Sequence, residues 1–258
     1  MEVRAPAMDS APVRPPAPAL RVKIFVRAQL VASCYRTPME RNLTHPDALT
    51  KPAFRGVLHQ YGFFASLAAG VVLLALARTP RAMLGGAIYV ASLSALLGTS
   101  ALYHRVTWSV SARRWMGRLD HSMINVLIAG TFTPFALVAL SDDLASILLV
   151  VIWSGAALGI ALHVFWFDAP KWLSAVLYVL LGWIGIVATP QLVERAGWTA
   201  AGLLLAGGIL YSAGAVVYAT RRPDPAPATF GYHEVFHALV VVAAAAHYGA
   251  VAITILPV

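Results

Sequence analysis

Residues 144–167 read LASILLVVIWSGAALGIALHVFWF, and this stretch decides the fold class. It contains no Asp, Glu, Lys or Arg in twenty-four residues, and about 20 apolar residues are enough for a helix to cross the hydrocarbon core of a membrane. The whole chain of 258 residues has the same character, with 59% apolar and 12% charged residues. A soluble domain carries roughly a quarter charged residues. The composition therefore excludes an ordinary soluble domain and predicts an integral membrane protein.

Seven blocks of this kind follow one another from residue 57 onward, separated by short polar joints. They cover 57–77, 82–104, 119–140, 144–167, 172–190, 198–219 and 233–256. The joints are too short to hold another domain, so residues 53–258 are predicted to form one all-α bundle of seven transmembrane helices. Residues 1–52 differ in kind, because they are basic and Pro-rich and contain no apolar stretch of spanning length. We interpret residues 1–52 as a disordered cytoplasmic tail.

The distribution of Lys and Arg predicts the orientation of the bundle. With the tail inside, sixteen of the nineteen basic residues fall on the inner side, and only Arg78, Arg81 and Arg195 fall outside. The bias without the tail is still seven to three. Because cytoplasmic loops carry the excess of basic residues, we expect a cytoplasmic N-terminus and an external C-terminus in the cell membrane. Topology thus explains the net charge of +8, and no nucleic-acid partner is expected.

Polar side chains inside the spans are functional candidates, because burying them in a membrane is costly. His104 ends the second span, with Ser100 one helical turn before it, and Asp120 opens the third span. His233 and His237 open the seventh span. These ends all lie at the inner side, so three histidines and one carboxylate reach the same membrane depth. The i, i+4 spacing of the last two histidines lets both rings face one ion.

This set has the composition of a catalytic zinc site. Such a site uses three protein ligands, leaves a fourth position to water, and has a carboxylate nearby to orient or deprotonate that water. The single cysteine, Cys34, excludes a cysteine-rich metal site and a disulfide framework. The alternative interpretation is that histidine and aspartate gather at the membrane interface because they are polar or amphipathic.

Other polar residues of the spans have two interpretations. Four lie near the inner ends, where they either support the metal ligands or sit as interfacial side chains: His59, Gln60, His121 and His163. His247 lies about 15 Å along the helix from His237, which is too far for the same ion. We therefore predict that His247 packs or makes an interhelical hydrogen bond.

Residues 233–237 read HEVFH, which also matches the HExxH pattern of zinc metalloproteases. In that interpretation Glu234 is the general base, and Asp120 from another span supplies a further ligand. His104 would then have no ligand role. The two interpretations therefore assign the general base to different carboxylates.

Several longer motifs accompany these residues. They are KPAFRG at 51–56, SALYH at 100–104, LDH at 119–121, HEVFHALVVV at 233–242 and HY at 247–248. Together they resemble the hemolysin III family, which is the bacterial branch of the progestin and adiponectin receptor superfamily. The resemblance covers residues 51–258 and all seven spans in order.

The resemblance implies one zinc ion near the cytoplasmic face, with His104, His233 and His237 as ligands. It also implies that Ser100 and Asp120 lie beside the water that the zinc holds. In this constellation the family is similar to alkaline ceramidases, which implies hydrolysis of an amide or ester bond of a membrane lipid. Asp120 would then act as the general base, and Ser100 would orient the water or stabilise the oxyanion.

Two other classes of function stay open at this point. One is a receptor or a sensor of membrane state, in which the zinc has a structural role. The other is a pore-forming lytic protein, as the family name suggests, although the spans show no amphipathic pore-lining pattern. The position of Glu234 is not a ligand position in the family, so the resemblance favours Asp120 as the base.

Overall fold

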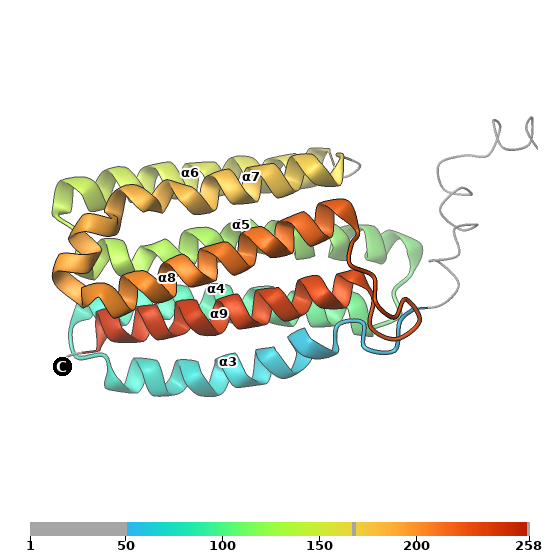
Figure 1. Ribbon diagram of the computed structural model, residues 1–258, viewed down its shortest axis with the longest axis horizontal. Coiled ribbons are helices and arrows are strands. Elements are labelled where there is room, and N and C mark those ends of the chain that lie inside the picture. Colours follow the sequence, from blue (N-terminus) through green and yellow to red (C-terminus); the bar gives the residue numbers. More distant parts are fainter. Residues whose placement is uncertain (1–50, 167–168, 257–258) are drawn as a thin grey trace, which may run out of the picture. The chain divides into compact units, whose positions relative to one another are not determined.

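The computed structural model describes residues 51–166 and 169–256. This part of the chain folds into α3 (Val57–Leu76), α4 (Pro80–Arg105), α5 (Val110–Ala139), α6 (Asp142–Phe165), α7 (Lys171–Trp183), the 3-10 turn η2 (Ile184–Ala188), α8 (Thr189–Thr220) and α9 (Tyr232–Ile255). It contains no β-strand beyond an isolated bridge between Ala226 and Phe230. The predicted all-helical fold is confirmed (Figure 1). The tail predicted for residues 1–52 lies almost wholly outside the described residues.

Six helical segments of the described residues are long and apolar enough to cross a membrane. Five of these segments are single helices. The remaining segment, Lys171–Thr220, has 50 residues and contains α7, η2 and α8. Figure 1 shows α7 and α8 as neighbouring antiparallel helices joined by a bend at η2. The protein is thus a multi-pass helical protein, and the count of seven crossings stays a prediction.

Two helix boundaries differ from the sequence prediction. α5 begins at Val110 rather than at residue 119, because the Ser109 hydroxyl caps it by accepting a hydrogen bond of 3.3 Å from the backbone N–H of Ala112. α8 begins at Thr189, so residues 191–196 of the joint predicted at 191–197 are helical. The break in this helix falls at Gly197, whose φ of 79° is readily adopted by glycine.

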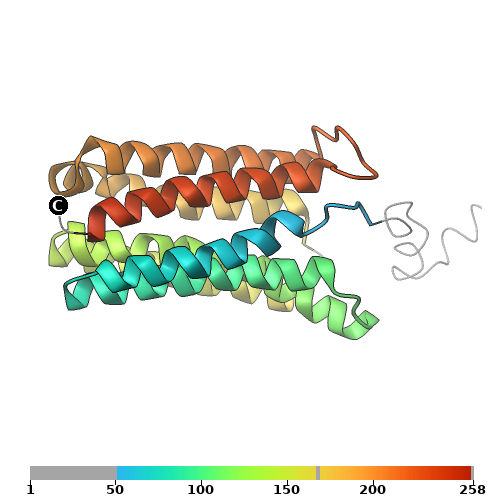
Figure 2. The ribbon, with the colours of Figure 1, turned by 90° about the horizontal axis from the view of Figure 1, so that it is seen from below.

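α5 is the central helix of the bundle. One apolar cluster joins it to α3, α4, α8 and α9, and a second cluster joins it to α6, α7 and η2. α4 approaches α5 closely, since a Cβ added to Gly130 would lie 2.1 Å from the Ser92 hydroxyl oxygen. α3 and α9 also lie side by side (Figure 2), and the Tyr248 hydroxyl donates a hydrogen bond of 2.8 Å to the Ala69 carbonyl. Helices distant in sequence are thereby fixed together.

The distribution of polarity is the reverse of that in a water-soluble protein. Large apolar side chains cover the outside, with Phe165 88% and Trp198 79% exposed. Polar side chains such as Ser100, His104 and His237 are buried instead. Contiguous apolar surface is expected where lipid is the solvent. Polar side chains of the bundle are therefore concentrated in its interior.

Candidate metal centre

Three buried histidines from two helices meet inside the bundle. Among residues 51–166 and 169–256, one group of three His, Cys or carboxylate side chains places a ligand atom of each within 4.8 Å of the others: His104, His233 and His237. His104 lies in the last turn of α4, and the other two lie in the first turns of α9. The Nε2 atoms of His104 and His233 are 3.2 Å apart. The structure thus brings the predicted histidines together in a cluster that can hold a metal ion.

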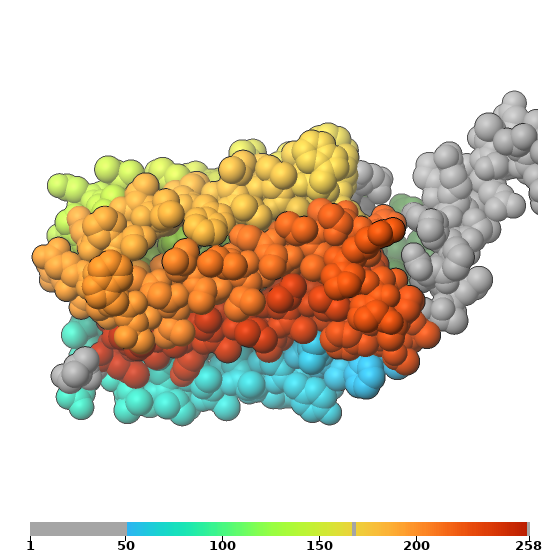
Figure 3. Space-filling model, in the orientation of Figure 1, coloured from blue at the N-terminus to red at the C-terminus, as the bar shows by residue number. Residues whose placement is uncertain are grey.

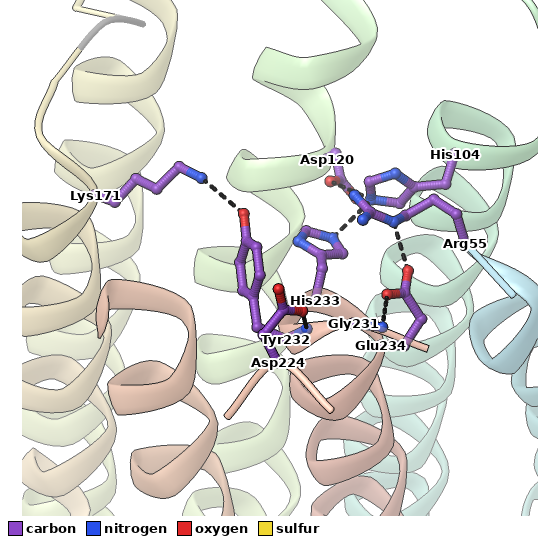
Figure 4. A network of polar contacts seen from close by, with 9 residues as sticks. All are labelled: Arg55, His104, Asp120, Lys171, Asp224, Gly231, Tyr232, His233 and Glu234. Carbon is purple, nitrogen blue, oxygen red and sulfur yellow. Dashed lines mark hydrogen bonds and ion pairs between the residues drawn. The ribbon is translucent and has the colours of Figure 1, made fainter. Parts of the chain in front are cut away.

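The predicted carboxylate and hydroxyl lie beside this cluster. The Oδ2 atom of Asp120, on α5, is 3.8 Å from Nε2 of His104, and the Asp120 side chain is only 12% exposed (Figure 4). Ser100 is buried one turn before His104 on α4, and its hydroxyl reaches the Asp120 carboxylate. The Asp120 carboxylate from a third helix, α5, and the Ser100 hydroxyl from α4 therefore lie beside the three imidazoles.

The chain segment before α3 supports the position of His104. Gly56 caps α3 with a φ of 79°, and a Cβ added there would lie 2.6 Å from the Cβ of His104. The same segment is tied to the loop before α9, because the backbone N–H groups of Ala53 and Phe54 donate to the carbonyls of Ala228 and Thr229. The sequence motif at 51–56 thus has a physical basis, since glycine alone combines this conformation with this close approach.

We expect Gly56→Ala to destabilise the protein by about 1–3 kcal/mol, because it adds a strained φ and a clash with His104. Thermal unfolding in detergent measures this change. Gly62→Ala is the matched control on the same helix, because its added Cβ would lie 3.5 Å from Leu97, which is an ordinary contact. Equal unfolding temperatures for the two variants would show that Gly56 has no special role.

Glu234 occupies a different position from the one that the protease pattern requires. Its side chain is 1% exposed, and both carboxylate oxygens accept hydrogen bonds, one from Nε of Arg55 and the other from the backbone N–H of Gly231 at 2.8 Å. A second carboxylate, Asp224, accepts a hydrogen bond of 2.8 Å from the N–H of Tyr232 (Figure 4). These contacts fix the N-terminus of α9 and join it to the segment before α3, which favours a structural role for Glu234.

Two of the remaining histidines have clear contacts. The ring of His59 stacks on that of His237, with centroids 3.7 Å apart and planes 12° apart, so His59 supports the cluster. His247 makes a hydrogen bond of 3.0 Å through Nε2 to the Leu204 carbonyl on α8. The predicted interhelical hydrogen bond of His247 is therefore confirmed.

A network of two histidines and two tyrosines lies next to the cluster. The Tyr178 hydroxyl lies 2.7 Å from Nε2 of His163 and donates a hydrogen bond of 3.2 Å to the His121 carbonyl. The Tyr218 hydroxyl lies 3.4 Å from Nε2 of His121. Neither tyrosine was predicted from the sequence, although both are polar residues near the predicted inner ends of the fifth and sixth blocks. The network ties four helices together at the level of Asp120.

A cavity of about 330 Å³ extends from the histidine cluster into the bundle. Asp120, His233 and His237 line one end of it, and Leu192 and Trp198 line the other. Most of the other side chains that line it are apolar. Figure 3 shows a hollow between the gold surface of α7 and the orange surface of α8, with green atoms of deeper helices visible in it. The buried polar centre thus adjoins an elongated apolar space at the side of the bundle.

Comparisons with known proteins place the chain among related sequences. The family model described as "Haemolysin-III related" matches residues 48–248. The chain is 34% identical over 161 residues to a hemolysin-3 homolog of Bacillus subtilis (strain 168). This match covers 62% of the chain and 72% of that protein. It is 36% identical over 165 residues to hemolysin-3 of Bacillus cereus, covering 63% and 75% of the two chains. It is also 29% identical over 189 residues to the adiponectin receptor protein of Drosophila melanogaster, covering 66% and 42%.

Proposed function

Since the chain belongs to the hemolysin III family, we propose that it is a zinc-dependent hydrolase that cleaves an amide or ester bond of a membrane lipid. The observation that carries this proposal is the position of the histidine cluster and Asp120 at one end of an apolar cavity. A reactive polar centre in contact with a long apolar space matches the two chemical parts of an acyl lipid. The scissile bond would lie at the cluster, and the chain would lie in the cavity.

The ligand set fits zinc better than it fits magnesium or calcium. Two nitrogens bound tetrahedrally to zinc at about 2.0–2.1 Å lie about 3.3 Å apart, and the Nε2 atoms of His104 and His233 are 3.2 Å apart. Magnesium and calcium prefer oxygen ligands, whereas imidazole suits zinc and related transition metals. Nδ1 of His237 is buried without a protein partner. An all-imidazole set beside a single carboxylate therefore supports zinc.

The side chains around the cluster have separate roles in the proposed reaction. Zinc supplies Lewis acidity, which activates water and polarises a carbonyl group. Asp120 accepts the proton of the attacking water as general base, because its carboxylate lies beside the cluster and lines the cavity. Ser100 orients that carboxylate and the water through its hydroxyl, or donates a hydrogen bond to the oxyanion. His59 holds the ring of His237 in place by stacking.

The proposal includes seven membrane crossings with a cytoplasmic N-terminus. α7 with η2 forms one crossing and α8 forms the next, in agreement with their antiparallel course in Figure 1. The charge bias places the histidine cluster near the cytoplasmic face. A lipid of the inner leaflet could then enter sideways between α7 and α8, where Figure 3 shows the hollow.

The topology prediction is tested by reporter fusions. We expect a reporter after Val258 to lie outside the cell and a reporter inserted after Thr107, between α4 and α5, to lie in the cytoplasm. An odd number of crossings places the two termini on opposite sides, whereas a single crossing by Lys171–Thr220 would place them on one side. A cytoplasmic C-terminal reporter would therefore contradict the seven-crossing arrangement.

The function is tested with purified protein and a mixture of isotopically labelled N-acyl and O-acyl membrane lipids. We expect elemental analysis to find about one zinc per chain, mass spectrometry to find free fatty acid, and chelation of the metal to stop its release. Bound zinc without turnover would instead support a receptor or sensor with structural zinc. The similarity to the Drosophila adiponectin receptor protein favours this second candidate.

A further inference from the structure

Three glycines of the cavity wall differ from the fourth glycine that lines it. A Cβ added to Gly182, Gly202 or Gly208 would meet no atom within 4 Å, and all three residues line the cavity. Gly185 also lines the cavity, but a Cβ there would lie 1.8 Å from the ring of Phe132. The absence of a side chain at the three open glycines therefore leaves space in the cavity rather than allowing two helices to pack.

The open glycines lie at graded distances from the metal centre. Gly182 follows Tyr178 by four residues of α7, which is about 6 Å of helix. Gly208 and Gly202 precede Tyr218 on α8 by ten and sixteen residues, or about 15 and 24 Å. Tyr178 and Tyr218 mark the level of the centre, because both contact His121, the neighbour of Asp120. The glycines are therefore spaced along the cavity from its polar end toward its far end.

We infer that Gly182, Gly208 and Gly202 determine the acyl-chain length that the protein accepts. The inference rests on the proposed function, because it takes the cavity to hold the acyl chain of the substrate with its carbonyl at the histidine cluster. A chain laid from the cluster along the cavity passes these glycines in the order Gly182, Gly208, Gly202. A side chain at any of them occupies the space of the methylene groups at that depth, so the accepted chain ends there.

Leucine substitutions test this inference without straining the backbone. None of the three glycines has a left-handed φ, and leucine has a higher helix propensity than glycine. Ala206→Leu is the matched control, because Ala206 is exposed on α8 between Gly202 and Gly208 and lies outside the cavity lining. Thermal unfolding of each variant confirms that the bundle is retained.

The measurement is the binding of free fatty acids, which does not depend on hydrolysis. Each purified variant is incubated with an equimolar mixture of saturated fatty acids from hexanoate to eicosanoate, and mass spectrometry quantifies the bound chains. We expect the longest chain that is bound to shorten most in Gly182→Leu, less in Gly208→Leu and least in Gly202→Leu. Forcing extra methylenes into a filled space typically lowers affinity about 5- to 150-fold, so longer chains should lose occupancy by about that factor.

The outcomes separate this inference from the proposed function. If all three variants bound the same range of fatty-acid lengths as the wild type, the inference would be overturned. The acyl chain would then leave sideways between α7 and α8 or lie elsewhere. Wild-type protein that binds no fatty acid would overturn it as well. Graded profiles in a protein without lipid turnover would support the length determinants and contradict only the hydrolase. The Ala206→Leu profile should equal that of the wild type, and a shortened profile there would show an effect that does not depend on the cavity.

Discussion

Asp120→Asn is expected to lower the rate of lipid hydrolysis by about 10²- to 10⁴-fold, which is the typical contribution of a general base. Asn keeps the size of the side chain, and its carbonyl oxygen can still accept the hydrogen bond from Ser100, but it does not act as a general base. The carboxylate oxygen is 3.8 Å from Nε2 of His104 and belongs to a third helix, so the three histidines keep their positions. We therefore expect zinc content to stay close to that of the wild type. Release of labelled fatty acid and elemental analysis measure the two quantities on the same sample.

Glu234→Gln is the matched variant, because the HExxH interpretation assigns the general base to this carboxylate. Glutamine can still accept the hydrogen bond from the N–H of Gly231, but it is neutral and so removes the ion pair with Arg55. We expect a loss of thermal stability and only a mild loss of activity. An inactive Glu234→Gln variant together with an active Asp120→Asn variant would contradict the mechanism proposed here and would support the protease-like one.

The helical course of the chain was readable from the sequence because its driving force is local. Each apolar block must be long enough to cross hydrocarbon, and every backbone polar group in it must be paired within the helix. Helix ends depend on single interactions instead. The Ser109 cap extends α5 beyond its apolar part, and Gly197 places the break of α8 at the last residue of the joint predicted at 191–197. The hydropathy of the sequence predicts neither the cap at Ser109 nor the break at Gly197.

The convergence of the candidate site was also predictable in part. The i, i+4 histidines of α9 and the shared depth of His104 and Asp120 follow from helix geometry and alternating direction. The ion pair of Arg55 with Glu234 spans 179 residues of sequence, and nothing in the local pattern of either residue indicates it. The cavity and its open glycines depend on how α7 and α8 separate, which is a property of tertiary packing.

His233→Ala and His237→Ala are expected to lower the zinc content from about one ion per chain toward zero, since a site with three protein ligands loses one of them. His104→Ala should behave in the same way, although its ligand comes from α4 rather than α9. Zinc loss in variants on two helices is a stronger result than zinc loss in the α9 variants alone. If a local disturbance of α9 were the cause of zinc loss, His104→Ala on α4 would keep its zinc. Elemental analysis of protein purified without added chelator measures the content.

His247→Ala provides the control for these variants. His247 belongs to the same helix as His233 and His237, is buried as His237 is, and also makes a polar contact with a neighbouring element. It lies about 15 Å along α9 from His237, so the variant should lose stability from the broken bond to Leu204 and keep its zinc. Stoichiometric zinc in all three ligand variants would place the ion elsewhere, and loss of zinc in His247→Ala would show that content follows the folding of α9 rather than coordination. Full retention in His247→Ala with loss in the other three is the pattern that three imidazoles on one ion require.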